Sequence, residues 1–150
     1  MKTGIVRKYK ILDTPNDGKI IFARLIVGLI FISEGIQKFI YIEMLGPGFF
    51  KELGFNAPLF WANFTGTFEI LCGTLVLLGL LTRLASIPLL IIMITAFFTT
   101  KLPILTTRGF WSFSHAYHTD FALTVLLILL IIYGAGKWSA DLKFATSEKH

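Results

Sequence analysis

An apolar run of membrane-spanning length, residues 20–42, contains three charged side chains. About 20 apolar residues in a helix are enough to cross the hydrocarbon core of a bilayer. A charge at the centre of that core costs roughly 2.5–3.5 kcal/mol on insertion scales, so a charged residue there needs a partner inside the protein. The charged residues of this run are Arg24, Glu34 and Lys38. We therefore expect a membrane protein with a polar interior.

Further apolar blocks follow and leave no room for a separate soluble domain. Hydrophobic residues make up 55% of the 150 residues, compared with about 45–50% in soluble domains. The predicted spans are about 20–42, 60–81, 84–100 and 117–136, between an N-terminal segment, 1–19, and a tail, 137–150. The predicted fold class is all-α membrane, an antiparallel bundle of four transmembrane helices that forms a single domain.

The net charge of +5 follows from membrane topology and does not indicate a nucleic-acid surface. Basic residues gather before the first span and after the last, and cytoplasmic segments are the ones enriched in Lys and Arg. These residues are Lys2, Arg7, Lys8, Lys10 and Lys19, and then Lys137, Lys143 and Lys149. Both termini are predicted to be cytoplasmic, which agrees with four spans. We expect an integral protein of the bacterial inner membrane, surrounded by the lipid bilayer and without a nucleic-acid partner.

Cysteine and histidine chemistry is sparse in this chain. The one cysteine, Cys72, excludes an intramolecular disulfide and a C-x-x-C redox pair. His115 and His118 stand three residues apart and Asp120 follows two residues later, which are too few ligands for a metal site. No metal is therefore predicted, and no cofactor motif is evident. The histidines lie in a predicted outer loop, 101–119, whose role is left open.

Charged residues of the first two spans share helix faces with glycines. At about 100° per residue, a helical wheel groups residues that are three, four or seven positions apart. The first span carries Arg24, Gly28, Gly35 and Lys38 on one face, and the second carries Gly66, Glu69 and Gly73. Because small residues let membrane helices approach closely, each buried charge is expected where a neighbouring helix comes nearest.

Glu34, Lys38 and Glu69 form the predicted chemical site. Helix rise places the three at similar depth, so two carboxylates face one ammonium. One glutamate is then expected to be protonated, or the two glutamates to share a proton. Intramembrane ionisable groups mark functional sites by default, so a catalytic or ligand-binding role is assigned to the three. The alternative is a structural clamp, in which Glu34 pairs with Lys38 at i, i+4 and Glu69 only holds the second span against the first.

Structural or interface roles are assigned to the remaining charged residues in or beside the spans. Arg24 and Arg83 lie near the inner ends of their spans, where long basic side chains reach lipid phosphates or meet Asp141. Asp120 opens the fourth span near the depth of Lys38. These residues are predicted to fix the helices in the membrane and to one another.

Three sequence elements, in order, resemble the DoxX family of small four-span membrane proteins. ARLIVGLIFISEGIQKF, at 23–39, is similar to the family's Arg-Leu, spaced glycine and Glu-Gly-x-x-Lys-Phe. GTFEILCGTLVLLGLLTR, at 66–83, resembles its second element, and GAGKWSAD, at 134–141, resembles its closing glycine-x-glycine and Ser-x-Asp. The resemblance covers about residues 20–141 and implies the four-span fold.

The resemblance also implies a link to redox chemistry. Some relatives are connected with thiosulfate:quinone oxidoreductase, and others with a membrane complex for thiol and oxidative-stress defence. This implies a membrane subunit of a quinone-linked thiol or sulfur redox system, which is an oxidoreductase only together with a bound quinone or a partner redox subunit. Two carboxylates beside an ammonium are compatible with this role. The reduction of a quinone is coupled to its protonation, and it therefore needs a proton donor near the quinone headgroup. The alternative is a non-catalytic membrane assembly factor, or a carrier for a partner protein or small lipophile. Whether the chain forms a homo-oligomer is left open.

Overall fold

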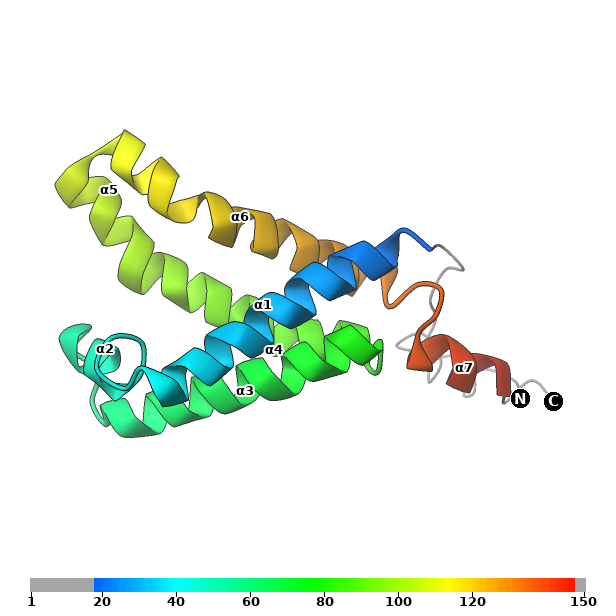
Figure 1. Cartoon of the computed structure of the whole chain (residues 1–150). Helices are drawn as coiled ribbons and strands as arrows, with labels where there is room; N and C mark the ends of the chain where they lie inside the picture. The colour runs from blue at the N-terminus through cyan, green and yellow to red at the C-terminus, as the bar shows by residue number, and fades with distance from the viewer. Residues whose placement is uncertain (1–17, 148–150) are drawn as a thin grey trace, which may run out of the picture.

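The computed structural model describes residues 18–147, and their side chains as far as residue 143. The described part is all helical and contains no strand (Figure 1). Four helical stretches are long and apolar enough to cross a membrane, namely Ile20–Ile40, Pro58–Leu78, Thr82–Arg108 and Phe110–Tyr133. This confirms the predicted all-α class with four spans. Most of the predicted N-terminal segment, 1–19, and the end of the predicted tail lie outside the described residues.

The helices run in the order α1 (Ile20–Ile40), α2 (Pro47–Glu52), α3 (Pro58–Leu78), α4 (Thr82–Ala96), η1 (Phe97–Lys101), α5 (Leu102–Arg108), α6 (Phe110–Tyr133) and α7 (Ala140–Ser147). The start of α1 and the end of α6 lie at one end of the bundle, which we call the terminal end (Figure 1). The short helices α2 and α5 lie at the opposite end, the loop end.

The third and fourth helical stretches extend beyond the apolar blocks that predicted them. The sequence predicts an outer loop at 101–119, but α4 continues through the π-helical turn η1 and α5 to Arg108, and α6 begins at Phe110. Pro103 lies in the first turn of α5, where a missing amide donor costs little. The break comes at Gly109, whose φ of +81° is readily adopted by glycine. Hydropathy therefore located the membrane-embedded part of each helix and not the helix ends.

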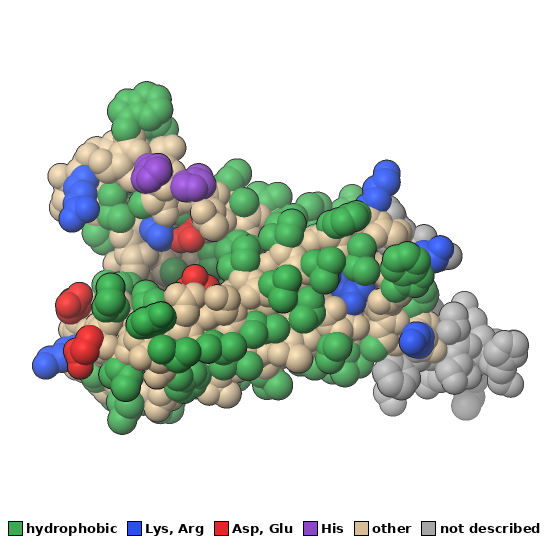
Figure 2. All heavy atoms as spheres, viewed as in Figure 1, with side chains coloured by type: hydrophobic (Ala, Val, Ile, Leu, Met, Phe, Trp, Pro, Cys, Tyr) green, Lys and Arg blue, Asp and Glu red, His purple; other side chains and the backbone are tan. Residues whose placement is uncertain are grey.

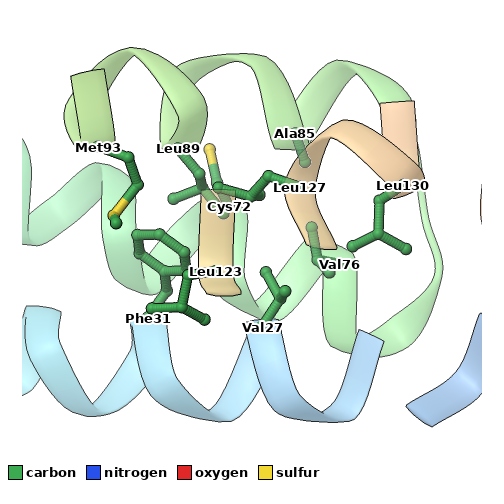
Figure 3. Close-up of a cluster of buried hydrophobic side chains, with 10 residues drawn as sticks. All are labelled: Val27, Phe31, Cys72, Val76, Ala85, Leu89, Met93, Leu123, Leu127 and Leu130. Atoms are coloured by element: carbon green, nitrogen blue, oxygen red, sulfur yellow. The ribbon is translucent and has the colours of Figure 1, made fainter. Parts of the chain in front are cut away.

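The hydrophobic core fills only the half of the bundle near the terminal end. Ten buried side chains from four helices meet there, as Figure 3 shows. They are Val27, Phe31, Cys72, Val76, Ala85, Leu89, Met93, Leu123, Leu127 and Leu130. Between Met93 and Leu123, no described residue is buried. The segment from the end of α4 to the first part of α6 is thus less tightly packed at the loop end, whereas α2 and α3 contribute buried residues there, among them Phe50 and Ala62.

Glycine contacts hold α1 directly against α3. A Cβ added at Gly35 would lie 2.7 Å from the Gly66 carbonyl oxygen, and one added at Gly28 would lie 3.0 Å from the Gly73 carbonyl oxygen. Such distances leave no space for a side chain, so the two backbones touch at both levels. The small residues predicted on these faces therefore serve close helix packing, as they do in many membrane bundles.

Two arms separate at the loop end. One arm consists of α1, α2 and α3, and the other of α4, η1, α5 and the first part of α6 (Figure 1). The space-filling view shows a hollow between the arms, with acidic and basic side chains at its walls (Figure 2). This hollow begins where the hydrophobic core ends.

Candidate functional site

Charged side chains replace the hydrophobic core toward the loop end. On α1, Glu34 and Lys38 come three and seven residues after the core residue Phe31. On α3, Glu69 comes three residues before the core residue Cys72. Because residues at these spacings share a helix face, the stripes that face the bundle axis change from apolar to charged midway along the spans.

Lys38 forms an ion pair with Glu69 across the interface of α1 and α3. The Lys38 Nζ donates to the Glu69 Oε2 at 2.6 Å. The two side chains are 14% and 4% exposed, so this pair lies largely inside the protein. The Gly35 and Gly66 contact one turn away brings the two helices close enough for the pair to form. Lys38 is thus bound to the second span and not to Glu34 on its own helix.

Glu34 lies beside this pair but outside it. Its side chain is exposed, and among the described residues it has no hydrogen bond or ion pair. Glu34 still acts on Glu69 through like-charge repulsion, which places the two carboxylates within electrostatic reach. The arrangement therefore combines a buried ion pair with a carboxylate that is accessible from outside the protein.

A second ion pair lies on the opposite arm. The Lys101 Nζ lies 3.1 Å from the Asp120 Oδ2, and it donates a hydrogen bond to the Ala116 carbonyl oxygen at 2.9 Å. Asp120 comes three residues before the core residue Leu123 on α6, so it too continues an axis-facing stripe. We call the hollow between the arms the loop-end cleft (Figure 2). Glu34, Lys38 and Glu69 belong to one of these arms, and Lys101 and Asp120 belong to the other.

Lys101 was not among the predicted site residues. A signal for it was available in the sequence, because Lys101 lies 8 residues before Gly109, where the chain turns, and Asp120 lies 11 residues after it. In an antiparallel helix pair such positions face each other. The sequence analysis does not use this signal, because it predicts a loop at 101–119.

The two histidines lie on α6 outside both ion pairs. The His118 Nδ1 is 2.6 Å from the His115 carbonyl oxygen, and the two rings are 5.6 Å apart. Within the described part of the chain, no three His, Cys, Asp or Glu side chains are grouped so that they could hold a metal ion. The charged groups that the loop-end cleft presents to a ligand are therefore its ammonium and carboxylate side chains.

Arg24 joins the helices at the terminal end. Its side chain is 3% exposed and donates to the carbonyl oxygens of Val76, Leu77, Ala135 and Trp138 at 2.8–3.3 Å. The first two acceptors end α3, and the other two lie between α6 and α7. Carbonyls at a helix end have no partner within the helix. Arg24 thus satisfies backbone groups of two distant segments and does not extend toward lipid phosphates.

Asp141 completes the same terminal-end cluster. Its carboxylate accepts hydrogen bonds from the backbone amides of Leu81 at 2.7 Å and Thr82 at 3.1 Å, which caps the start of α4. These hydrogen bonds offset the backbone strain at Leu81, which has a left-handed conformation with a φ of +50°. Arg83, also assigned a structural role, donates to the Ile132 carbonyl oxygen of α6 at 3.1 Å.

The three sequence elements that carry the family resemblance meet in these clusters. Arg24 from the first element, the Gly79 turn from the second and Asp141 from the third lie together at the terminal end. Lys38 from the first and Glu69 from the second meet in the loop-end cleft. Chemically, the terminal-end cluster fixes backbone, whereas the cleft offers ammonium donors and carboxylates to a polar group that enters between the arms.

Comparisons with known proteins agree with the resemblance. The family model DoxX matches residues 20–102, which include α1, α3 and α4. An uncharacterized membrane protein of Mycobacterium tuberculosis is 48% identical to this chain over 138 residues, covering 88% of this chain and 85% of that protein. No solved structure matches the chain.

Proposed function

The chain belongs to the DoxX family of membrane proteins, and from that premise we propose that it is the membrane subunit of a quinone-linked thiol or sulfur redox system. The proposal places the chain in the bacterial inner membrane, with both termini in the cytoplasm and a redox protein as its partner. The observation that carries it is the loop-end cleft, where the buried Lys38–Glu69 pair stands beside the accessible Glu34. The cleft would hold the quinone headgroup.

The residues of the loop-end cleft fit a quinone headgroup. Its two carbonyl oxygens accept hydrogen bonds, and the cleft contains two ammonium donors, Lys38 on one arm and Lys101 on the other. Charged donors form hydrogen bonds about twice as strong as neutral ones. The apolar faces of the spans, which are exposed to the bilayer, suit the hydrophobic tail of such a molecule.

A bound quinone supplies the capacity to take up two electrons, here from a redox centre of the partner protein, together with two protons. Glu34, which is accessible and has no partner among the described residues, is assigned the transfer of protons. Lys38 is assigned the orientation of the headgroup, with Glu69 as the counter-charge that keeps its ammonium in place. Cys72 is buried in the core and has no part in this chemistry.

A competing function is that of a non-catalytic assembly factor, or of a carrier for a partner protein or small lipophile. The observation in its favour is the arm formed by α4, η1, α5 and the first part of α6, where no described residue between Met93 and Leu123 is buried. Such an arm offers its surface to another protein. Under this function the charges of the cleft are dispensable once the helices are packed.

Replacing the ion pair with neutral residues separates the two functions. We expect the double variant Lys38→Met with Glu69→Gln to fold, because neither charge is left buried without its partner. Its Kd for a short-chain quinone analogue, measured by equilibrium dialysis with the protein in nanodiscs, should rise about 10-fold or more, the equivalent of one lost charged hydrogen bond. Glu52→Gln on the exposed part of α2 is the control and should bind as wild type does. Unchanged binding by the double variant would favour the competing function.

A further inference from the structure

Polar side chains also lie on the sides of α1 and of α3 that point away from the bundle axis. On α1, Ser33 and Gln37 stand about 180° and 140° from the buried Arg24, and on α3, Asn63 and Thr67 stand about 120° and 160° from the buried Glu69. Three of the four side chains are exposed, and Gln37 is half-buried. Lipid offers such groups no hydrogen bonds, so their position calls for an explanation.

These four side chains lie at membrane depth. With a rise of about 1.5 Å per residue, Gln37, Asn63, Ser33 and Thr67 are about 5–14 Å inside the loop-end limits of α1 and α3. All four therefore fall in one half of the membrane, where polar side chains gather mainly at contacts between helices.

Asn63 is the member whose hydrogen-bonding groups are least satisfied. Gln37 donates to the Ser33 hydroxyl at 3.0 Å, but within the described part of the chain neither Asn63 nor Thr67 has a side-chain hydrogen bond. Beside them lies a groove of about 310 Å³, lined by Phe60, Asn63, Phe64, Thr67 and Phe68. A lipid tail would fill this groove but would leave the amide of Asn63 without a partner.

We propose that a second copy of this chain docks on the face of α3 that carries this groove, with the Asn63 side chains of the two copies hydrogen-bonded to each other. A two-fold axis brings the same patch of each copy together. A side-chain amide has both donors and an acceptor, so two amides satisfy each other in such a contact. The face is well suited to docking, because the glycine contacts hold α1 and α3 as one unit. The proposal does not depend on the quinone-linked function.

Disulfide trapping tests the contact, because Cys72 is the only cysteine of the chain. In a Cys72→Ser background, Thr67→Cys, which lies one turn from Asn63 in the same groove and leaves its amide in place, should form a covalent dimer under mild oxidation in nanodiscs that are large enough for two copies. Ile128→Cys, on the exposed surface of α6, is the control for random collision and should stay monomeric. Equal cross-linking at both positions, or none at Thr67→Cys, would overturn the proposal.

A second measurement avoids the engineered cysteine. The monomer–dimer equilibrium of the purified chain in lipid vesicles, followed by single-molecule photobleaching, should show dimers for wild type. Asn63→Leu should weaken them about tenfold, the expected loss for an interhelical polar contact. A wild-type chain that stays monomeric at high protein-to-lipid ratio would overturn the second-copy proposal and would point to a different protein on this face. Dimers that are unaffected by Asn63→Leu would also overturn it.

Discussion

Arg24→Met is expected to cause the largest loss of stability of any single substitution at the terminal end. It removes hydrogen bonds to four carbonyl oxygens, which belong to the end of α3 and to the segment between α6 and α7. A buried polar group left without its partner costs about 1–3 kcal/mol, so we expect a loss of about 3 kcal/mol or more. Arg24→Lys should lose nearly as much, because one ammonium cannot span four acceptors that a planar guanidinium reaches.

Cys72 provides a direct measurement of this loss. Its side chain is 4% exposed in the core, so a maleimide dye reacts with it only when the bundle opens. We expect the apparent Tm of Arg24→Met in mild detergent to fall by about 10 °C, on the usual scaling for a chain of this size. Arg108→Met replaces an exposed arginine at the end of α5 and should leave the Tm nearly unchanged. A Tm for Arg24→Met within a degree or two of wild type would show that the terminal-end cluster is not structural.

Gly35→Ala should destabilise the protein although it adds only one methyl group. The new Cβ would lie 2.7 Å from both the Gly66 carbonyl oxygen and the Ile70 Cγ1, closer than real Cβ contacts. Since one of these neighbours is backbone, α1 and α3 must move apart, and overpacking of this kind typically costs about 1–3 kcal/mol. The separation also affects the loop-end cleft, because Lys38 and Glu69 lie within a turn of the contact.

Two readouts check this prediction. The Cys72 reaction should show a lower apparent Tm for Gly35→Ala, and the variant should bind the quinone analogue more weakly than wild type at a temperature where both are folded. Gly18→Ala is the matched control, because a Cβ there meets nothing within 4 Å. If Gly35→Ala matched Gly18→Ala in both measurements, the close approach of α1 and α3 would contribute neither to stability nor to quinone binding.

The fold class could be predicted from the sequence because membrane burial leaves a direct mark on composition. Apolar blocks of span length located the four spans, and the glycines of α1 and α3 indicated where helices approach. The end of the third helical stretch was predicted too early, because hydropathy falls at Lys101 while the helix ends only at Gly109. A helix ends where its backbone geometry changes, and hydropathy contains no information on that.

The site could be predicted only in part, for similar physical reasons. Charges inside a span must find partners, so the sequence singled out Lys38 and Glu69, which the structure places 2.6 Å apart. The sequence could not decide between Glu34 and Glu69 as the partner of Lys38, because that choice depends on how α1 and α3 pack. Nor could it show the acceptors of Arg24, since these are backbone carbonyls, which any residue type provides.

The quinone content of the purified protein tests the central proposal most directly. The protein would be purified in mild detergent, extracted with organic solvent and analysed for quinone, with wild type and Glu69→Gln compared at matched lipid content. We expect about one quinone per wild-type chain and a clear loss in the variant, because the ammonium of Lys38 then lacks the counter-charge that holds it in the cleft. Quinone that is no more abundant in the wild-type extract than in the surrounding lipid, with the variant unchanged, would contradict the proposal.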